Sequence, residues 1–207
     1  MKFMDFVERY GQLGVIHSSE VVGLVARPDV FRVQLNQWKE KGYLVPLKRG
    51  VYLVSQRFLK HEVPLFYISN ELIFPSYVSL ESAMAFYGLI PEGVFRGVVA
   101  VTTRKTETIY NKVGVFHYHH VKPSLFMDFR MVNIDGFTVK IASPEKSLLD
   151  YFYLRKIEER EMEGLRLQNL EIVNLAELES LSLSYPMRVQ KIVRRLRKHK
   201  EMFLQIP

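Results

Sequence analysis

A predicted helix that ends at a glycine and leads directly into two short apolar strands is the feature that most constrains the fold of this chain. The helix covers residues 28–41. Three apolar residues at i, i+4, i+7 spacing form one face of it: Phe31, Leu35 and Trp38. Gly42 follows, and glycine is the residue type that most often ends a helix. Residues 43–47 and 51–54 have the composition of strands, with the basic turn Lys48-Arg49-Gly50 between them. This order predicts a winged helix-turn-helix, in which a recognition helix leads into a β-hairpin wing.

The residues that precede and follow this segment define the domain boundary. Residues 2–10 place apolar side chains at helical spacing, and a serine pair can cap a second helix over residues 18–25. Residues 56–64 are charged and have the composition of a linker. We therefore predict a winged helix-turn-helix domain over residues 1–58 and a second domain over residues 63–207.

The second domain is predicted to contain several strands. Residues 98–102 and 114–121 are β-branched or alternating runs, which are typical of strands. Residues 129–134 and 137–142 flank Asp135-Gly136, and this dipeptide between apolar runs is a strong hairpin signal. The sequence thus predicts an antiparallel hairpin in this domain.

Helices are predicted around these strands. Ser79 and Ser143 each stand just before a helical run, where a hydroxyl can cap the first turn. Pro144 and Glu145 suit the first turn of the helix that follows Ser143. Residues 187–203 form a basic amphipathic helix, which we expect to pack on the domain with its basic face in solvent. The predicted fold class is α+β, an N-terminal winged helix-turn-helix followed by a mixed α/β C-terminal domain with antiparallel hairpins.

Composition excludes several classes of protein. The chain has no cysteine, which excludes disulfides, thiolate catalysis and cysteine-ligated zinc. No apolar run approaches the roughly 20 residues that a bilayer span needs, and the N-terminal segment carries acidic residues where a signal peptide would be apolar. We expect a soluble, cytoplasmic protein with no membrane partner. The net charge is +7, and the two ends are basic while the middle is acidic, which favours a polyanionic partner at the ends.

The predicted recognition helix and wing carry side chains suited to double-stranded DNA. Seven residues are predicted to contact it: Arg27, Arg32, Asn36, Gln37, Lys39, Lys48 and Arg49. Asn36 and Gln37 are the residue types that pair bidentately with adenine, and Arg32 can read guanine or bind phosphate. The other four suit the phosphate backbone, with the wing-tip pair also suited to the minor groove. The alternative is a three-helix domain that is used only for protein contacts.

An acid–lysine–acid set offers an alternative function of another class, a metal-dependent nuclease. Glu145, Lys146 and Asp150 are the residue types that hold a magnesium ion and a phosphate. The same residues also have a structural explanation, because Glu145 complements a helix N-terminus and Lys146 with Asp150 forms an i, i+4 pair. We favour the structural explanation and predict no catalytic residue.

Three histidines near one another raise the question of a metal site. Alternation along a strand places His117 and His119 on one face, and His120 follows them. A third ligand cannot be assigned from the sequence, and Asp128 is only one of several acids available. We expect ordinary surface imidazoles, and we predict no metal and no cofactor.

Four sequence runs resemble a known family. They are LNQWKEKGYLVPLKRGVYLV, YVSLESAMAFYGLIPE, VAVTTRKT with the following VGVFHYHHV, and IASPEKSLLDYFYL. Together they resemble the AbiEi-type antitoxins of bacterial phage-defence loci, a family of predicted transcriptional regulators of viral defence systems. The resemblance extends from the N-terminus to about residue 156, and its most specific parts are SLESAMAFYGLIPE and SPEKSLLDYFYL.

This resemblance implies a bipartite antitoxin. Its N-terminal winged helix would repress its own operon at inverted repeats, through residues that match Arg32, Asn36, Gln37, Lys48 and Arg49. Its C-terminal domain would counter a nucleotidyltransferase toxin encoded alongside, in a type IV arrangement that requires no direct binding between the two proteins. The expected function is therefore DNA-binding transcriptional repression together with antitoxin activity, and a protein-interaction adaptor is a third possibility.

Overall fold

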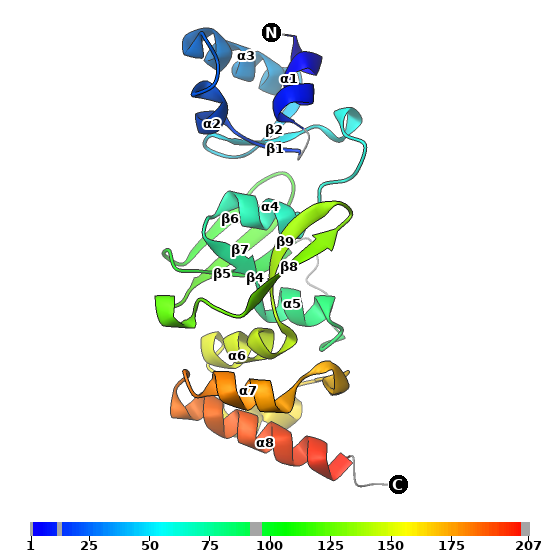
Figure 1. The fold of residues 1–207 in the computed structure, drawn as a ribbon, viewed down its shortest axis with the longest axis vertical. Helices are drawn as coiled ribbons and strands as arrows, with labels where there is room; N and C mark the ends of the chain where they lie inside the picture. The colour runs from blue at the N-terminus through cyan, green and yellow to red at the C-terminus, as the bar shows by residue number, and fades with distance from the viewer. Residues whose placement is uncertain (1, 12–13, 92–96, 204–207) are drawn as a thin grey trace.

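The computed structural model describes residues 2–11, 14–91 and 97–203, which form a mixed α+β protein. Its described part contains eight α-helices and two β-sheets, one of three strands and one of six. The molecule is elongated, with an N-terminal unit of helices and a small sheet at one end and the last helices at the other (Figure 1). Within the described residues, every helix is too short or too polar to cross a bilayer.

The N-terminal unit combines three helices with a three-stranded antiparallel sheet. Its elements, in chain order, are α1 (Phe3–Tyr10), β1 (Val15–His17), α2 (Ser18–Val22), α3 (Pro28–Glu40), β2 (Leu44–Lys48) and β3 (Val51–Val54). The sheet order is β1-β3-β2, so the β2–β3 hairpin is completed by the strand that precedes α2. Gly42 and Gly50 have positive φ values of 66° and 79°, which explains why glycine ends α3 and closes the hairpin.

Aromatic side chains hold this unit together. The predicted apolar face of α3 is confirmed, because Phe31, Leu35 and Trp38 are all buried. The ring centroid of Trp38 lies 4.7 Å from that of Phe6 and 5.2 Å from that of Phe3, so α1 and α3 share one core. The second predicted helix is shorter than expected and ends at Val22.

The larger unit is built on a six-stranded mixed sheet in the order β6-β7-β5-β4-β9-β8. The strands are β4 (Ser76–Val78), β5 (Gly97–Thr102), β6 (Glu107–Tyr110), β7 (Val115–His120), β8 (Phe129–Ile134) and β9 (Phe137–Ala142). β5 and β7 are parallel, as are β4 and β9, and the other neighbours are antiparallel. The predicted hairpin around Asp135-Gly136 is confirmed, with both residues at positive φ.

Helices cover both faces of this sheet. They are α4 (Leu65–Leu72), α5 (Leu80–Phe86), α6 (Pro144–Leu154), α7 (Leu175–Ser182) and α8 (Met187–Phe203). Figure 1 shows α4 between the sheet and the N-terminal unit, α5 and α6 on the opposite face, and α7 and α8 stacked beyond them. Short 3₁₀ segments connect these elements at Gln56–Phe58, Pro123–Leu125, Glu159–Gly164 and Leu170–Ile172.

The two units share apolar contacts. Each has a hydrophobic cluster of its own, but three residues of the N-terminal sheet belong to the larger cluster: Val15, Leu47 and Val51. Val63, in the predicted linker, is buried in the same cluster. The β2–β3 hairpin therefore packs against the second unit as well as its own helices.

Candidate nucleic-acid interface

The face of α3 opposite its core is exposed and mostly polar. Arg32, Asn36, Gln37 and Lys39 are all exposed there, while Phe31, Leu35 and Trp38 hold the other face in the core. Four of the seven residues predicted to contact DNA are therefore brought together on one helix. A helix with a fixed core face holds such side chains in a defined arrangement, which is what base recognition needs.

Local hydrogen bonds order two of these side chains. Arg32 donates to the Asp29 carboxylate over 3.0 Å, and Lys39 donates to Oδ1 of Asn36 over 3.3 Å. Both hydrogen bonds are exposed to solvent, so each contributes little to the free energy of folding. The side chains can therefore exchange these bonds for contacts with a ligand. Asp29 and Glu40 also lie on exposed positions of α3, and their charges balance those of Arg32 and Lys39.

A hollow of about 530 Å³ lies beside this helix. Its lining comes from α2, α3 and β3: Ser18, Ser19, Val22, Arg32, Leu35, Asn36 and Tyr52. The hydroxyls of the two serines and the side chains of Arg32 and Asn36 give it hydrogen-bond donors. The surface is thus concave between α2 and α3 and carries groups that suit phosphate or base edges.

The remaining three predicted contacts are in different situations. Arg27, at the start of α3, and Arg49, in the hairpin turn, are exposed. Lys48 is not at a free tip, because its ammonium donates to the main-chain carbonyl of Leu72 at the end of α4. Partial burial lowers the pKa of Lys48. The structure therefore separates Lys48 from the other six residues and places it at the junction between the two units.

Other polar contacts join the hairpin region to the second unit. Nε2 of His17 lies 2.9 Å from a carboxylate oxygen of Glu71, and the Asn111 side-chain amide donates to the carbonyl of Leu47 over 3.2 Å. Together with Lys48, these contacts reach α4 and the β6–β7 turn. Sequence reasoning missed them because the partners are far apart along the chain.

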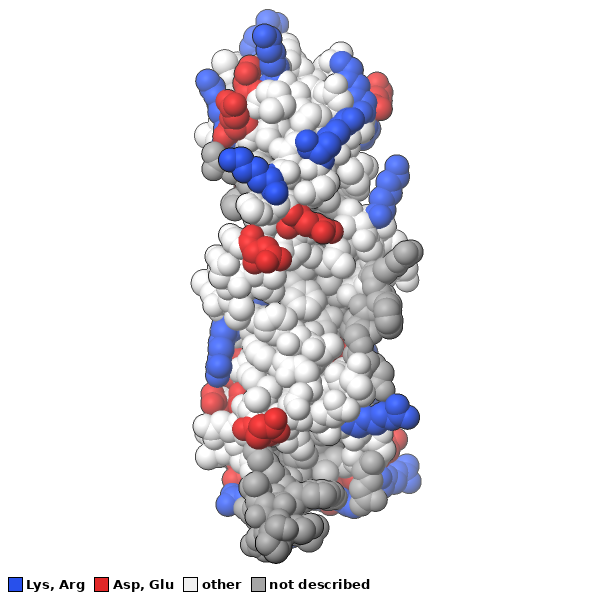
Figure 2. Space-filling view, turned by 90° about the vertical axis from the view of Figure 1, so that its right-hand side faces the viewer, with Lys and Arg blue, Asp and Glu red and all other residues white. Residues whose placement is uncertain are grey.

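Charged side chains are unevenly spread over the surface. On the face that Figure 2 shows, Lys and Arg side chains lie over the N-terminal unit together with some Asp and Glu, and the stretch over the six-stranded sheet carries few charged side chains. In the sequence of the N-terminal unit, Lys and Arg are in excess over Asp and Glu. This excess favours contact with a polyanion at the N-terminal unit rather than over the sheet.

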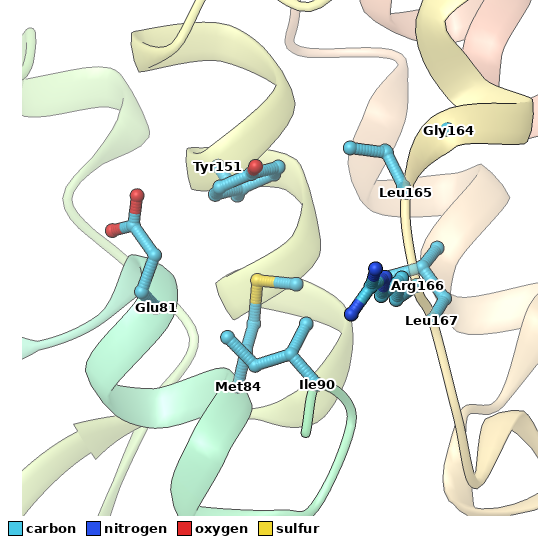
Figure 3. A pocket seen from close by; sticks show the side chains of 8 residues that line it. All are labelled: Glu81, Met84, Ile90, Tyr151, Gly164, Leu165, Arg166 and Leu167. Carbon is cyan, nitrogen blue, oxygen red and sulfur yellow. The ribbon is translucent and has the colours of Figure 1, made fainter. Parts of the chain in front are cut away.

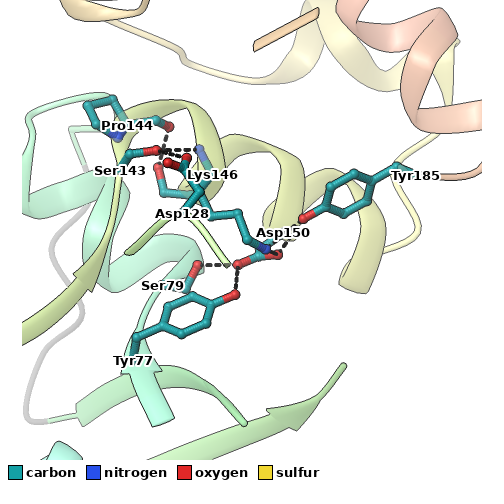
Figure 4. A network of polar contacts seen from close by, with 9 residues as sticks. Tyr77, Ser79, Asp128, Ser143, Pro144, Lys146, Asp150 and Tyr185 are labelled. Atoms are coloured by element: carbon teal, nitrogen blue, oxygen red, sulfur yellow. Dashed lines mark hydrogen bonds and ion pairs between the residues drawn. The ribbon is translucent and has the colours of Figure 1, made fainter. Parts of the chain in front are cut away.

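The acid–lysine–acid set is not a surface site. Glu145, Lys146 and Asp150 are all buried, with 2%, 1% and 0% of their surface exposed. Lys146 donates to Oδ1 of Asp150 across one helical turn of α6, as the i, i+4 spacing predicted (Figure 4). The Glu145 carboxylate accepts a hydrogen bond from the main-chain N–H of Asn174 over 2.7 Å, and this bond links α6 to the segment that leads into α7.

Three further hydroxyls complete the Asp150 network. Tyr77 and Ser79 donate to Oδ2 of Asp150 over 2.9 and 2.8 Å, and Tyr185 donates to Oδ1 over 2.9 Å. Lys146 also donates to the Tyr185 hydroxyl over 2.6 Å. Figure 4 shows these groups converging from β4, α6 and the segment before α8. Ser79 is the N-cap residue of α5, as predicted, but its side chain makes no capping hydrogen bond and its hydroxyl donates to Asp150 instead.

The electrostatics of this network keep both tyrosines protonated. Burial raises the pKa of Tyr77 and of Tyr185, and the Asp150 carboxylate raises both further. Burial lowers the pKa of Lys146, while the neighbouring Asp150 carboxylate opposes that shift. The buried Asp150 carboxylate accepts hydrogen bonds from four donors, so its hydrogen-bonding capacity is filled within the protein. No side of this carboxylate is left open to a substrate.

The histidines do not converge on a metal. His117 and His119 share one face of β7, as predicted. His117 contacts the Thr108 hydroxyl over 3.1 Å, His119 lies 3.3 Å from the Arg155 guanidinium, and His120 contacts the carbonyl of Arg104. Burial and the Arg155 charge lower the pKa of His119. No group of three or more metal-ligating side chains occurs among the described residues.

A cleft of about 270 Å³ opens between α5, α6 and residues 164–167. Figure 3 shows its lining: Glu81, Met84, Ile90, Tyr151, Gly164, Leu165, Arg166 and Leu167. The Glu81 carboxylate is held by the Arg155 guanidinium in two hydrogen bonds of 2.6 and 2.8 Å. The cleft therefore has a mainly apolar lining with charges at its rim, and it contains none of the predicted site residues.

The C-terminal basic helix packs on its own unit, as predicted. Val189, Ile192, Val193 and Leu196 are buried. The Arg188 guanidinium donates to the main-chain carbonyls of Phe152, Tyr153 and Ile157, and these hydrogen bonds cap the C-terminal end of α6. Arg188 thus has a structural role, and Arg197 of the same helix donates to the Glu179 carboxylate of α7 over 2.6 Å.

Neither a protein-family model nor a curated protein matches this chain.

Proposed function

We propose that the N-terminal unit is a winged helix-turn-helix that binds double-stranded DNA through α3. The observation that carries this proposal is the exposed set Arg32, Asn36, Gln37 and Lys39 on a helix whose opposite face is buried. Helix α2 precedes α3 after a short connection, and the β2–β3 hairpin follows it, which is the order of a winged helix.

The dimensions of α3 support the same proposal. Arg27 and Lys39 are twelve positions apart along the chain, which corresponds to roughly 18 Å of helix axis. The major groove is about 12 Å wide, so these two cations can reach the phosphate strands on either side of it. Asn36 and Gln37 then lie between them, where base edges are exposed. Arg49 in the hairpin turn adds a phosphate contact, and Lys48 is left out of the proposed surface.

A binding assay with base substitutions tests this assignment. The probe is the duplex that the full-length chain selects from a randomised pool, and its affinity is compared with that of a random duplex of equal length. Asn36→Ala and Gln37→Ala should each weaken binding to the selected duplex by about 1–3 kcal/mol and relax specificity at one base pair. Arg49→Ala is the matched control, because loss of a phosphate contact outside α3 should weaken both duplexes alike. Equal losses on both duplexes for Asn36→Ala and Gln37→Ala would refute base reading by these residues.

We further propose that the chain is a transcriptional repressor and antitoxin of the AbiEi type, acting at inverted repeats in its own operon. The support is the resemblance of SLESAMAFYGLIPE and SPEKSLLDYFYL to that family. Cytoplasmic operation and a functional link to a nucleotidyltransferase toxin are part of this proposal. The test is growth rescue of cells that express the nucleotidyltransferase toxin that this proposal places beside the gene. Absence of rescue by the full-length chain would refute the antitoxin role.

Burial of the acid–lysine–acid set supports our preference for DNA binding over the nuclease alternative. Lys146 and Asp150 are buried with each other and with two tyrosines, and neither presents an open side to a phosphate. We therefore assign Glu145, Lys146 and Asp150 to the stability of the second unit.

A further inference from the structure

The exposed face of α3 consists of two rows of different chemistry. Arg32, Asn36 and Lys39 follow one another at i, i+4, i+7, and they form a polar, basic row. A second row contains two valines and an amide at i, i+3, i+7: Val30, Val33 and Gln37. Val30 is 41% exposed and Val33 is 57% exposed. The two valines thus border the amides that we propose to read bases.

These valines contribute little to the fold. The core face of α3 is already filled by Phe31, Leu35 and Trp38, and the valines point away from it. β-Branched residues are also poorer helix formers than the alanine, lysine or glutamate that usually occupy a solvent-facing helix surface. One exposed valine needs no explanation, since many apolar side chains are exposed in proteins. Two exposed valines in one row of a proposed recognition helix are better explained by contact with a ligand.

The geometry points to thymine as that ligand, and we propose that Val33 contacts the 5-methyl group of a thymine in the major groove. This inference rests on the proposed DNA binding by α3. The thymine methyl is the only apolar group that base pairs present in the major groove, and apolar side chains recognise it. The Val33 side chain has no hydrogen-bond donor or acceptor. Next to cytosine or guanine it would leave the cytosine amino group or the guanine oxygen without a hydrogen-bond partner.

Val33 is the better placed of the two valines. It is three positions before Asn36 and four before Gln37, so it is a surface neighbour of both amides. The base it contacts is therefore next to, or paired with, the adenine that an amide reads. Val30 lies one turn closer to the start of the helix and is less exposed. Val33 is accordingly assigned as a specificity-determining residue for thymine.

Replacement of thymine by deoxyuridine tests this assignment, because it removes only the methyl group. The probe is the duplex selected by the full-length chain, with each thymine replaced singly. We expect one or two positions at which deoxyuridine weakens binding of the wild-type chain about threefold to fivefold, the value of one buried methyl group. Val33→Ala, which shortens the side chain by two methyl groups, should lose most of the preference for thymine over deoxyuridine at that position. Arg49→Ala, which removes a proposed phosphate contact outside α3, is the control: it should weaken both duplexes alike and keep the wild-type preference for thymine.

Three results would overturn the inference. One is a wild-type affinity that no deoxyuridine substitution changes, and another is an unchanged thymine preference in Val33→Ala. A third is a loss of self-association in Val33→Ala with its thymine preference intact, which would make the valine row a contact between two copies of the chain. If the wild-type chain selects no duplex at all, the proposed DNA binding itself fails before any deoxyuridine is introduced.

Discussion

Nε2 of His17 lies 2.9 Å from a carboxylate oxygen of Glu71, and this contact joins the end of β1 to α4 across the junction of the two units. The side chains are 24% and 31% exposed, so the pair is partly shielded from water. Glu20 and Lys48 are the other charged groups that influence His17. The strand that precedes α2 is therefore tied electrostatically to the helix that covers the large sheet.

This pair predicts a pH-dependent stability. The hydrogen bond to Glu71 raises the pKa of His17 above its ordinary value of 6.5, against an opposing effect of burial. Because the folded-state pKa is raised, the pair stabilises the protein fully below pH 6.5 and loses that contribution as the pH rises through the folded-state pKa. We expect the urea midpoint of the wild-type chain to fall over this window relative to that of His17→Gln. Parallel curves for the two proteins would show that the pair contributes nothing.

The hairpin turn predicts opposite behaviour of two neighbouring cations. Lys48 donates to the Leu72 carbonyl, whereas Arg49 is exposed. Lys48→Ala should leave the salt dependence of DNA binding unchanged and lower stability instead. Arg49→Ala should reduce the slope of log affinity against log salt by about one unit, as expected for one lost phosphate contact. Titrations between low and moderate salt on the same duplex compare the two variants. A reduced slope for Lys48→Ala would mean that its contact with α4 is given up on DNA.

The buried pair in α6 predicts a large asymmetric effect on stability. Asp150→Ala leaves the Lys146 ammonium buried without its carboxylate, and removal of one partner of a buried pair costs about 3–5 kcal/mol. The double change Lys146→Met with Asp150→Leu removes both charges and should recover most of that loss. Denaturant unfolding of the full-length chain measures the free energy of unfolding for both variants. A double variant no more stable than Asp150→Ala would show that the tyrosine and serine donors, rather than the charge pair, dominate the network.

Local sequence signals predicted the elements that depend on neighbours in the chain. The Asp135-Gly136 hairpin, the Ser143 cap and the amphipathic face of α3 are all of this kind. Helix α4 was missed because it is buried on most sides between the sheet and the N-terminal unit, so its sequence lacks a clear polar face. β6 is a short edge strand with alternating exposure and gave no apolar run.

The candidate site was predictable only where the fold is local. The spacing of Phe31, Leu35 and Trp38 defines the opposite face of α3 and hence the exposure of Asn36 and Gln37. The environment of Lys48 depends on Leu72, which is 24 residues away, and no local pattern contains that information. The burial of Lys146 likewise comes from Tyr77 and Tyr185, which lie far from it in sequence.

The apolar contacts of the hairpin give the last prediction, on a fragment of residues 1–58. Leu47 and Val51 belong to the core of the second unit, so the fragment exposes them. The fragment should keep the base preference of α3, because Phe6, Phe31 and Trp38 form a separate cluster, but it should be less soluble than the full-length chain. Leu47→Thr with Val51→Thr should make the fragment more soluble and destabilise the full-length chain, since burial of each large apolar side chain is worth about 1.5–3 kcal/mol. Solubility of the fragment and unfolding of the full chain measure the two effects. A double variant that leaves the stability of the full-length chain unchanged would mean that the hairpin does not pack on the second unit in solution.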